Sequence, residues 1–116
     1  MKRKSLTAIE HENLNTFHKR GCQNRTKCKV NQVCLDMSNS KIHSLKMLDI
    51  CRELLDKDHK FICEAVPNKI PGRRYDIVDI TELTIIECEV TGKLKLDADI
   101  TYMYTKEGWK KYYGGF

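Results

Sequence analysis

Residues 73–92 read RRYDIVDITELTIIECEVTG, and this stretch decides the fold. Two runs rich in Ile, RYDIVDI and LTIIECEV, are separated only by Thr81 and Glu82, a pattern that predicts two antiparallel strands joined by a short turn. Three carboxylates, Asp76, Glu87 and Glu89, interrupt these apolar runs, where burial of a charge is costly. The sequence therefore raises the question of what neutralises them.

A hairpin centred between Thr81 and Glu82 pairs residues whose numbers sum to 163, so that Asp76 lies directly opposite Glu87. Because side chains alternate along a strand, Glu89 shares the face of Glu87, and all three carboxylates project from one side of the sheet. A slip of one residue would send Asp76 to the other face. The register therefore decides whether the acids form a group.

Grouped carboxylates are typical ligands of Mg²⁺ or Mn²⁺. A metal so placed lowers the pKa of a bound water and stabilises the charge that develops on a scissile phosphate. The alternative is ordinary ion pairing, in which Asp76 meets a basic neighbour and Arg74 faces Glu89. The spacing of the acids leaves both open.

The segments on either side supply further elements. Residues 38–60, SNSKIHSLKMLDICRELLDKDHK, predict a helix capped by Ser38, Asn39 or Ser40, with one apolar stripe beside Cys51 and Leu54; the stripe consists of Ile42, Leu45, Leu48 and Leu55. Residues 59–66, HKFICEAV, predict a buried strand, and the loop PNKIPGRR follows it. Residues 93–104, KLKLDADITYMY, alternate at period two, yet we expect a helix after Gly92 and then a short strand at KKYY, because the faces of the sheet need cover.

Residues 1–37 are predicted to form a basic N-terminal arm, and residues 38–116 the core. Residues 1–35 carry eight Lys or Arg against Glu10 and Glu12, whereas the remainder has 13 basic and 14 acidic residues. The arm is expected to hold a helix over residues 5–20, capped by Ser5, and then a loop. Such an arm suits either a solvated tail or a surface that follows phosphates.

Six cysteines fall into two groups. Cys51, Cys63 and Cys88 lie inside apolar segments and are predicted to be buried thiols. The arm has the spacing H-x3-C-x5-C-x5-C, which offers the right atoms for Zn²⁺ but not the close first pair of an ordinary finger, with free thiols or a disulfide as the alternatives; these residues are His18, Cys22, Cys28 and Cys34. No long apolar run and no secretory signal is present, so we expect a soluble, intracellular protein without a membrane partner.

A helix, a strand carrying Glu64, GRRYDIVDI and then TIIECEV follow one another over about residues 38–105. This order resembles the core of the PD-(D/E)xK nuclease superfamily, which includes archaeal Holliday-junction resolvases and type II restriction enzymes. The resemblance implies a restriction-endonuclease-like α/β core, with a mixed sheet, an antiparallel hairpin and flanking helices. It also implies DNA as the partner, Mg²⁺ or Mn²⁺ as the cofactor and, by analogy, a homodimer.

Residue by residue, the resemblance makes Asp76 the motif Asp, Glu87 the motif acid and Glu89 the occupant of the usual Lys position. Asp76 and Glu87 would ligate the metal, and Glu89 would be a catalytic residue that also ligates it or accepts a proton from water. Glu64 would be a ligand of a second ion or an ion-pair partner of Arg73. Further contributions would come from Lys93 as a catalytic cation and from DNA contacts at His43, Arg73, Arg74 and Lys95, while Glu53 is an alternative to His43 on the helix. A lysine at 93 or 95 is equally consistent with a solvated surface.

The sequence thus predicts a metal-dependent deoxyribonuclease with Glu in place of the motif Lys. The first alternative is a non-catalytic nucleic-acid-binding protein that uses the cysteine-bearing arm, and the second is a protein–protein adaptor. Aromatic residues and lysines also interleave near the C-terminus. This pattern suits base stacking, but core packing or a dimer interface is the use that we predict for the aromatic set: Tyr102, Tyr104, Trp109, Tyr112 and Tyr113.

Overall fold

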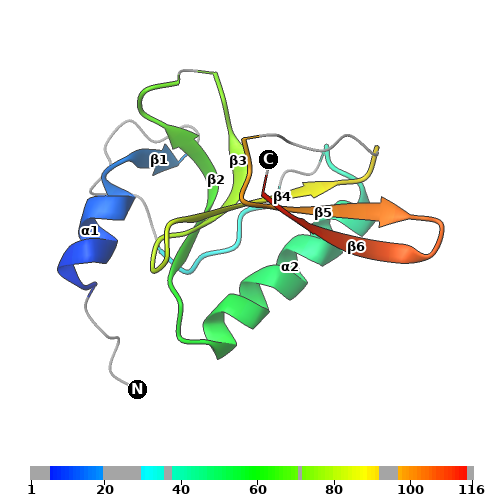
Figure 1. Cartoon of the computed structure of the whole chain (residues 1–116), viewed down its shortest axis with the longest axis horizontal. Helices are drawn as coiled ribbons and strands as arrows, with labels where there is room; N and C mark the ends of the chain where they lie inside the picture. Colours follow the sequence, from blue (N-terminus) through cyan, green and yellow to red (C-terminus); the bar gives the residue numbers. More distant parts are fainter. Residues whose placement is uncertain (1–5, 20–29, 36–37, 71, 92–96, 115–116) are drawn as a thin grey trace.

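Six strands form one mixed sheet in the order in which they follow along the chain (Figure 1). The computed structural model describes residues 6–19, 30–35, 38–70, 72–91 and 97–114. Within these ranges the elements are α1 (Ala8–Leu14), β1 (Phe17–Lys19), α2 (Lys41–Asp56), β2 (Phe61–Pro67), β3 (Tyr75–Asp79), β4 (Thr84–Glu89), β5 (Ile100–Thr105) and β6 (Gly108–Tyr113). The predicted α/β class with a mixed sheet is confirmed.

The predicted register of the β3–β4 hairpin is confirmed. Ile77 pairs with Ile86 and Val78 with Ile85, so paired numbers sum to 163. The four residues between the strands form a turn in which Asp79 Oδ1 accepts hydrogen bonds from the Thr81 amide at 2.9 Å and the Glu82 amide at 3.3 Å. This side-chain-capped turn explains how a Thr-Glu pair, which is poor for a two-residue hairpin, closes the strands.

Helix α2 begins after Ser40, whose hydroxyl accepts a hydrogen bond from the His43 amide as an N-cap should. The predicted buried stripe is wrong: Ile42, Leu45, Leu48 and Leu55 are 38–51 % exposed. The helix instead buries the adjacent face, which consists of His43, Met47, Ile50, Cys51 and Leu54. Both faces have helical spacing, and only the fit to the sheet chooses between them.

The segment after β4 corrects a second prediction. Residues 100–105 form strand β5 rather than a helix, whereas residues 93–96 of the expected helix lie outside the described residues. β5 runs parallel to β4, and β6, which contains the predicted KKYY strand, returns antiparallel. The period-two alternation was therefore the correct signal, and pairing with the free edge of β4 satisfies the backbone of β5.

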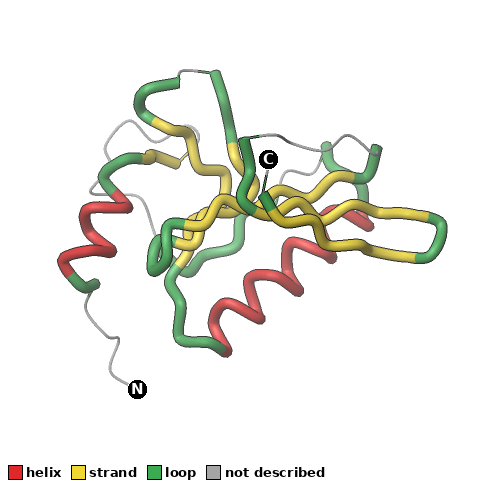
Figure 2. Tube along the Cα trace, viewed as in Figure 1, coloured by secondary structure: helices red, strands yellow, loops and turns green. Residues whose placement is uncertain are grey.

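The N-terminal helix is shorter than predicted. Thr7, not Ser5, caps α1 in a reciprocal capping box with Glu10, and Ser5 lies outside the described residues. Residues 17–19, which the spacing assigned to the helix, form β1 and pair with the edge of β2, starting at Phe17 opposite Pro67. The tube in Figure 2 shows this short strand after the helix, with a short loop between them.

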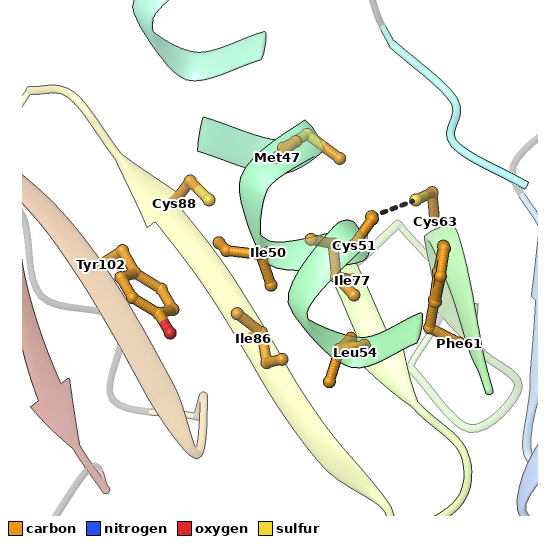
Figure 3. Close-up of a cluster of buried hydrophobic side chains, with 10 residues drawn as sticks. All are labelled: Met47, Ile50, Cys51, Leu54, Phe61, Cys63, Ile77, Ile86, Cys88 and Tyr102. Carbon is orange, nitrogen blue, oxygen red and sulfur yellow. Dashed lines mark hydrogen bonds between the residues drawn. The ribbon is translucent and has the colours of Figure 1, made fainter. Parts of the chain in front are cut away.

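Two hydrophobic clusters lie on opposite faces of the sheet. The first packs α2 onto β2, β3, β4 and β5 (Figure 3), and it contains Met47, Ile50, Cys51, Leu54, Phe61, Cys63, Ile77, Ile86, Cys88 and Tyr102. The second packs α1 and β1 against β2 and β3, and it contains Leu14, Phe17, Ile62, Ala65, Tyr75, Val78 and Ile80. The three cysteines predicted to be buried are buried, and the sulfurs of Cys51 and Cys63 are 3.8 Å apart, a thiol contact rather than a bond. Neither described helix has the length and apolar character that crossing a membrane requires.

Candidate functional site

The centre of the site is a pair of buried carboxyl groups on neighbouring strands. Asp76 and Glu87, which the hairpin register places opposite each other, are each less than 10 % exposed. Burial, the charge of Asp76 and a hydrogen bond with it raise the pKa of Glu87 to about 9, although Arg73 acts in the opposite direction. Glu87 is therefore neutral at pH 7 and donates its proton to Asp76, so that the pair holds one proton between two acids.

Asp76 is kept ionised by three donors. Burial would raise the pKa of its carboxyl group, but hydrogen bonds from His43, Glu87 and the Cys88 amide lower it below the usual value. The Cys88 amide is 2.8 Å from Asp76 Oδ2, and this contact lies beyond the last pair of the β3–β4 ladder, Ile77 with Ile86. The Asp76 carboxylate thus receives a backbone donor where the ladder between the two strands has ended.

His43 brings helix α2 into the site. Its Nε2 lies 3.4 Å from Asp76 Oδ2, and both side chains are about nine-tenths buried. The hydrogen bond to Asp76 raises the pKa of His43 against the effect of burial, and the charges of Asp76, Glu89 and Glu64 add to the increase. The predicted contribution of His43 from the helix is therefore placed beside the carboxyl pair, whereas Glu53 is exposed and pairs with Lys57.

Arg73 holds the other side of Glu87. One of its terminal nitrogens lies 3.1 Å from Glu87 Oε1, while Nε and the same terminal nitrogen bind the two oxygens of Asp97 at 2.8 and 3.0 Å. The guanidinium also stacks 4.4 Å from the centre of the Tyr75 ring, and the Tyr75 hydroxyl donates to Asp97. Arg73 is thus fixed by two acids and an aromatic face.

Glu64 occupies an irregular position in β2. Its Oε2 lies 3.0 Å from Arg74 Nε, so Glu64 pairs with Arg74, the neighbour of the arginine that one alternative had named. Its φ of 56° is rare for a residue with a side chain, and the β2–β3 pairing omits it between Cys63 and Ala65. This irregularity shifts the alternation of the strand, because Cys63 packs with the α2 cluster and Ala65 with the opposite one.

A cleft of about 390 Å³ opens where these groups meet, at the N-terminal end of α2. Glu89 lies at its wall and accepts a hydrogen bond from the Thr91 hydroxyl at 2.6 Å. The residues lining the cleft are Ser38, Asn39, Ser40, His43, Arg73, Arg74, Asp76, Glu87, Cys88, Glu89, Val90 and Thr91. The three carboxylates that the register grouped therefore do share one cleft, together with two arginines.

Several predicted site residues belong to the part of the chain that the structure does not describe. Lys93, Lys95, Cys22 and Cys28 lie outside the described residues, as does the side chain of His18. Cys34 is described, and its free thiol packs at the margin of the α2 cluster. The predicted zinc or disulfide group of the arm therefore stays a prediction.

The site fits a divalent cation through two carboxylates rather than three. Among the residues that the structure describes, no three His, Cys, Asp or Glu side chains form a group that could hold a metal ion. Glu64, the expected third ligand, is paired with Arg74. Asp76 and Glu87 remain, and a hard ion that keeps several waters needs only one or two protein carboxylates. These two acids are the described residues that could hold such an ion.

Sequence reasoning missed Asp97 and Tyr75. Tyr75 had a local signal only in its place two residues after Arg73, close enough along the chain for the ring and the guanidinium to meet. Asp97 had none, since it follows β4 by eight positions and reaches Arg73 only through the parallel return of the chain to β5.

Comparisons of the chain with family profiles, with curated proteins and with solved structures find no match. The nuclease resemblance therefore depends on the residue pattern and on the chemistry of the cleft.

Proposed function

We propose that this protein is a divalent-metal-dependent nuclease that hydrolyses phosphodiester bonds of DNA. The observation that carries the proposal is the buried pair of carboxyl groups of Asp76 and Glu87. The two groups face each other across the hairpin in the predicted register, line one cleft and share one proton. Two carboxyl groups forced together in this way repel once both ionise. A cation in place of the proton relieves that repulsion.

Mg²⁺ or Mn²⁺, when bound, would supply an activated water and stabilise the charge on the phosphate. The surrounding residues have separate tasks in this proposal. The Cys88 amide and His43 hold the Asp76 carboxylate in one orientation. Glu89, less buried at the cleft wall, is the group available to accept a proton, and it stands where the superfamily pattern has Lys.

The two arginines would recognise the phosphate backbone. Arg73 and Arg74 both line the cleft, and a guanidinium binds phosphate oxygens through two parallel hydrogen bonds. Arg73 now bonds to Glu87, so metal binding at Glu87 requires Arg73 to leave that carboxyl group while keeping Asp97. Lys93 and Lys95 stay predictions for the cation and the DNA contact.

The test is cleavage of plasmid and single-stranded DNA with Mg²⁺, with Mn²⁺ and with EDTA. We expect cleavage only with metal, and loss of cleavage in Glu87→Gln. A matched control is Glu107→Gln, because Glu107 is exposed, contacts Lys110 and does not line the cleft. Cleavage that survives EDTA, or that Glu87→Gln leaves unchanged, would contradict the proposal.

One observation favours a second candidate, a nucleic-acid-binding protein without catalysis. Arg73 and Arg74 already contact Glu87 and Glu64, as expected if the acidic cleft were structural. DNA that is retarded but intact in every lane of the same experiment would support this candidate.

A further inference from the structure

The β5–β6 hairpin presents aromatic and basic side chains on one face. The cross-strand pairs Tyr102 with Lys111 and Tyr104 with Trp109 lie on the same face as Ile100 with Tyr113. Core packing, one of the two uses predicted for these aromatics, holds for Tyr102 and in part for Trp109, whereas Tyr104 is 40 % and Tyr113 is 73 % exposed. The predicted dimer interface stays a prediction. With Lys46 of α2, side chains of this face form what we call the aromatic–lysine surface, defined by Lys46, Tyr104, Trp109, Lys111 and Tyr113.

Two lysines are held against the rings of this surface. Lys46 Nζ lies 4.7 Å from the centre of the Tyr102 ring and 5.7 Å from that of Trp109. Lys111 Nζ lies 4.9 Å from the centre of the Tyr113 ring. The charge of Lys46 is thus held beside one buried and one partly buried ring, and that of Lys111 beside the exposed ring of Tyr113.

The same face of the hairpin carries no acid. Its residues are Ile100, Tyr102, Tyr104, Trp109, Lys111 and Tyr113, all of them described. Exposed rings with cations between them match a ligand that alternates flat bases with negative phosphates. A protein partner that bound by apolar contact would not need the lysines, and an acidic one would not need the rings.

The position of this surface connects it to the cleft. β5 pairs with β4 so that Tyr102 lies beside Cys88 and Met103 beside Glu89, and Cys88 and Glu89 both line the cleft. Tyr104, with the Trp109 ring 5.2 Å away, follows directly along β5. The hairpin projects beyond the neighbouring strands at this end of α2 (Figure 1). A chain lying on the surface could therefore continue into the cleft.

We infer that the aromatic–lysine surface binds an unpaired nucleic-acid strand, with bases stacked on Tyr104 and Tyr113 and phosphates beside Lys46 and Lys111. In a duplex the base faces are covered by their neighbours, so the surface selects single-stranded over double-stranded DNA. The inference rests on the proposed function in one respect only, namely that the bound strand is the substrate of the nuclease. Binding itself needs no metal.

The test is fluorescence anisotropy of the full chain with a labelled oligothymidylate and a labelled duplex of equal length, in EDTA. We expect tighter binding of the single strand. Tyr113→Ala and Tyr104→Ala should each weaken it by roughly fivefold or more, since stacking contributes about 1–3 kcal/mol per base and 1.4 kcal/mol is tenfold. Tyr113→Phe should bind as the unchanged protein does, because the ring remains.

Tyr112→Ala is the matched control. Tyr112 lies on the same strand and is 41 % exposed, but it pairs with Thr101 on the opposite face. Equal losses in Tyr112→Ala and Tyr113→Ala, or no preference for the single strand, would overturn the inference. The inference would also be overturned if Tyr104→Ala and Tyr113→Ala bound the single strand as before but changed the oligomeric state of the protein. That result would assign the surface to a second copy of the chain.

The two proposals fail separately. If no DNA is cut under any condition but Tyr113→Ala still loses single-strand binding, the nuclease proposal falls and this inference stands. If metal-dependent cleavage depends on Glu87 but single-strand binding ignores Tyr104 and Tyr113, the inference falls and the nuclease proposal stands.

Discussion

Strand β3 carries a His–Asp pair at each end, and the two pairs differ in what surrounds them. At the start of the strand His43 lies 3.4 Å from Asp76, and at its end His59 lies 2.7 Å from Asp79. Both pairs tie α2, or the residues just after it, to the same strand. Only the first has a second buried acid opposite.

The difference shows when such a pair is structural. Asp79 accepts from two backbone amides of the β3–β4 turn as well as from His59, so its hydrogen bonds serve the chain itself. Asp76 accepts from one backbone amide and from His43, and also faces Glu87. The same residue types therefore close a turn at one end and build a candidate site at the other.

The largest expected effect is on DNA cleavage, and it distinguishes the two His–Asp pairs. Asp76→Asn should lower DNA cleavage by on the order of 100-fold or more, since a metal supplies several kcal/mol of charge stabilisation in the transition state. Asp79→Asn should leave the cleavage rate nearly unchanged, because its amide oxygen still accepts from the turn. Rates on plasmid DNA with Mn²⁺ measure both, and equal losses would show that the two ends are not distinct.

The next effect is on the free energy of unfolding, and here Asp79 is the important residue. Asp79→Ala should lower the free energy of unfolding by about 1–3 kcal/mol, because the Thr81 and Glu82 amides and His59 lose their acceptor. Urea denaturation measures this cost. Asp79→Asn is the control, since it keeps the turn acceptor, and a loss in Asp79→Asn as large as in Asp79→Ala would assign the effect to charge instead.

A third prediction uses the proton of the carboxyl pair. The pKa of Glu87 is raised from 4.5 to about 9, so between these values the folded protein binds more protons than the unfolded chain. The free energy of unfolding should therefore fall as pH rises through this window, by up to about 1.4 kcal/mol per pH unit from this group. Its contribution is fully present below pH 4.5 and is lost as pH rises towards 9.

Glu87→Gln isolates this effect, because an amide cannot titrate but can still donate to Asp76. Urea denaturation at pH 5, 7 and 9 should show that unchanged protein loses stability relative to Glu87→Gln as pH rises. A difference that stays constant with pH would mean that Glu87 is ionised throughout, and the shared proton would be excluded.

The smallest expected effect is at Glu82, the acid at the Asp79 end of β3 that corresponds to Glu87 at the Asp76 end. Glu82 Oε1 lies 3.6 Å from His59 Nε2, but the Glu82 side chain is 65 % exposed. Glu82→Gln should change the free energy of unfolding by no more than about 0.5 kcal/mol, as for most exposed ion pairs. A cost above about 1 kcal/mol would give the Asp79 end a second acid of consequence and would weaken the contrast.

Much of the hairpin and part of the site could be predicted from local pattern. Alternating apolar residues around Thr81 and Glu82 predicted the register, and with it the facing of Asp76 and Glu87. The buried face of α2 could not be predicted, because Ile42, Leu45 and Leu48 recur every three residues and His43, Met47 and Ile50 every three or four, and both spacings suit one face of a helix. The strand at 100–105 was signalled by its alternation, yet an expectation about sheet coverage outweighed that signal.

The sequence alone determined that Asp76 and Glu87 face each other, because strand alternation and a short turn act between residues close along the chain. Only the tertiary structure decided their protonation and partners. His43 comes from the preceding helix, and Asp97, which holds Arg73, comes from beyond β4. A pKa depends on burial and on every charge nearby, and those neighbours are set by packing between distant segments rather than by spacing.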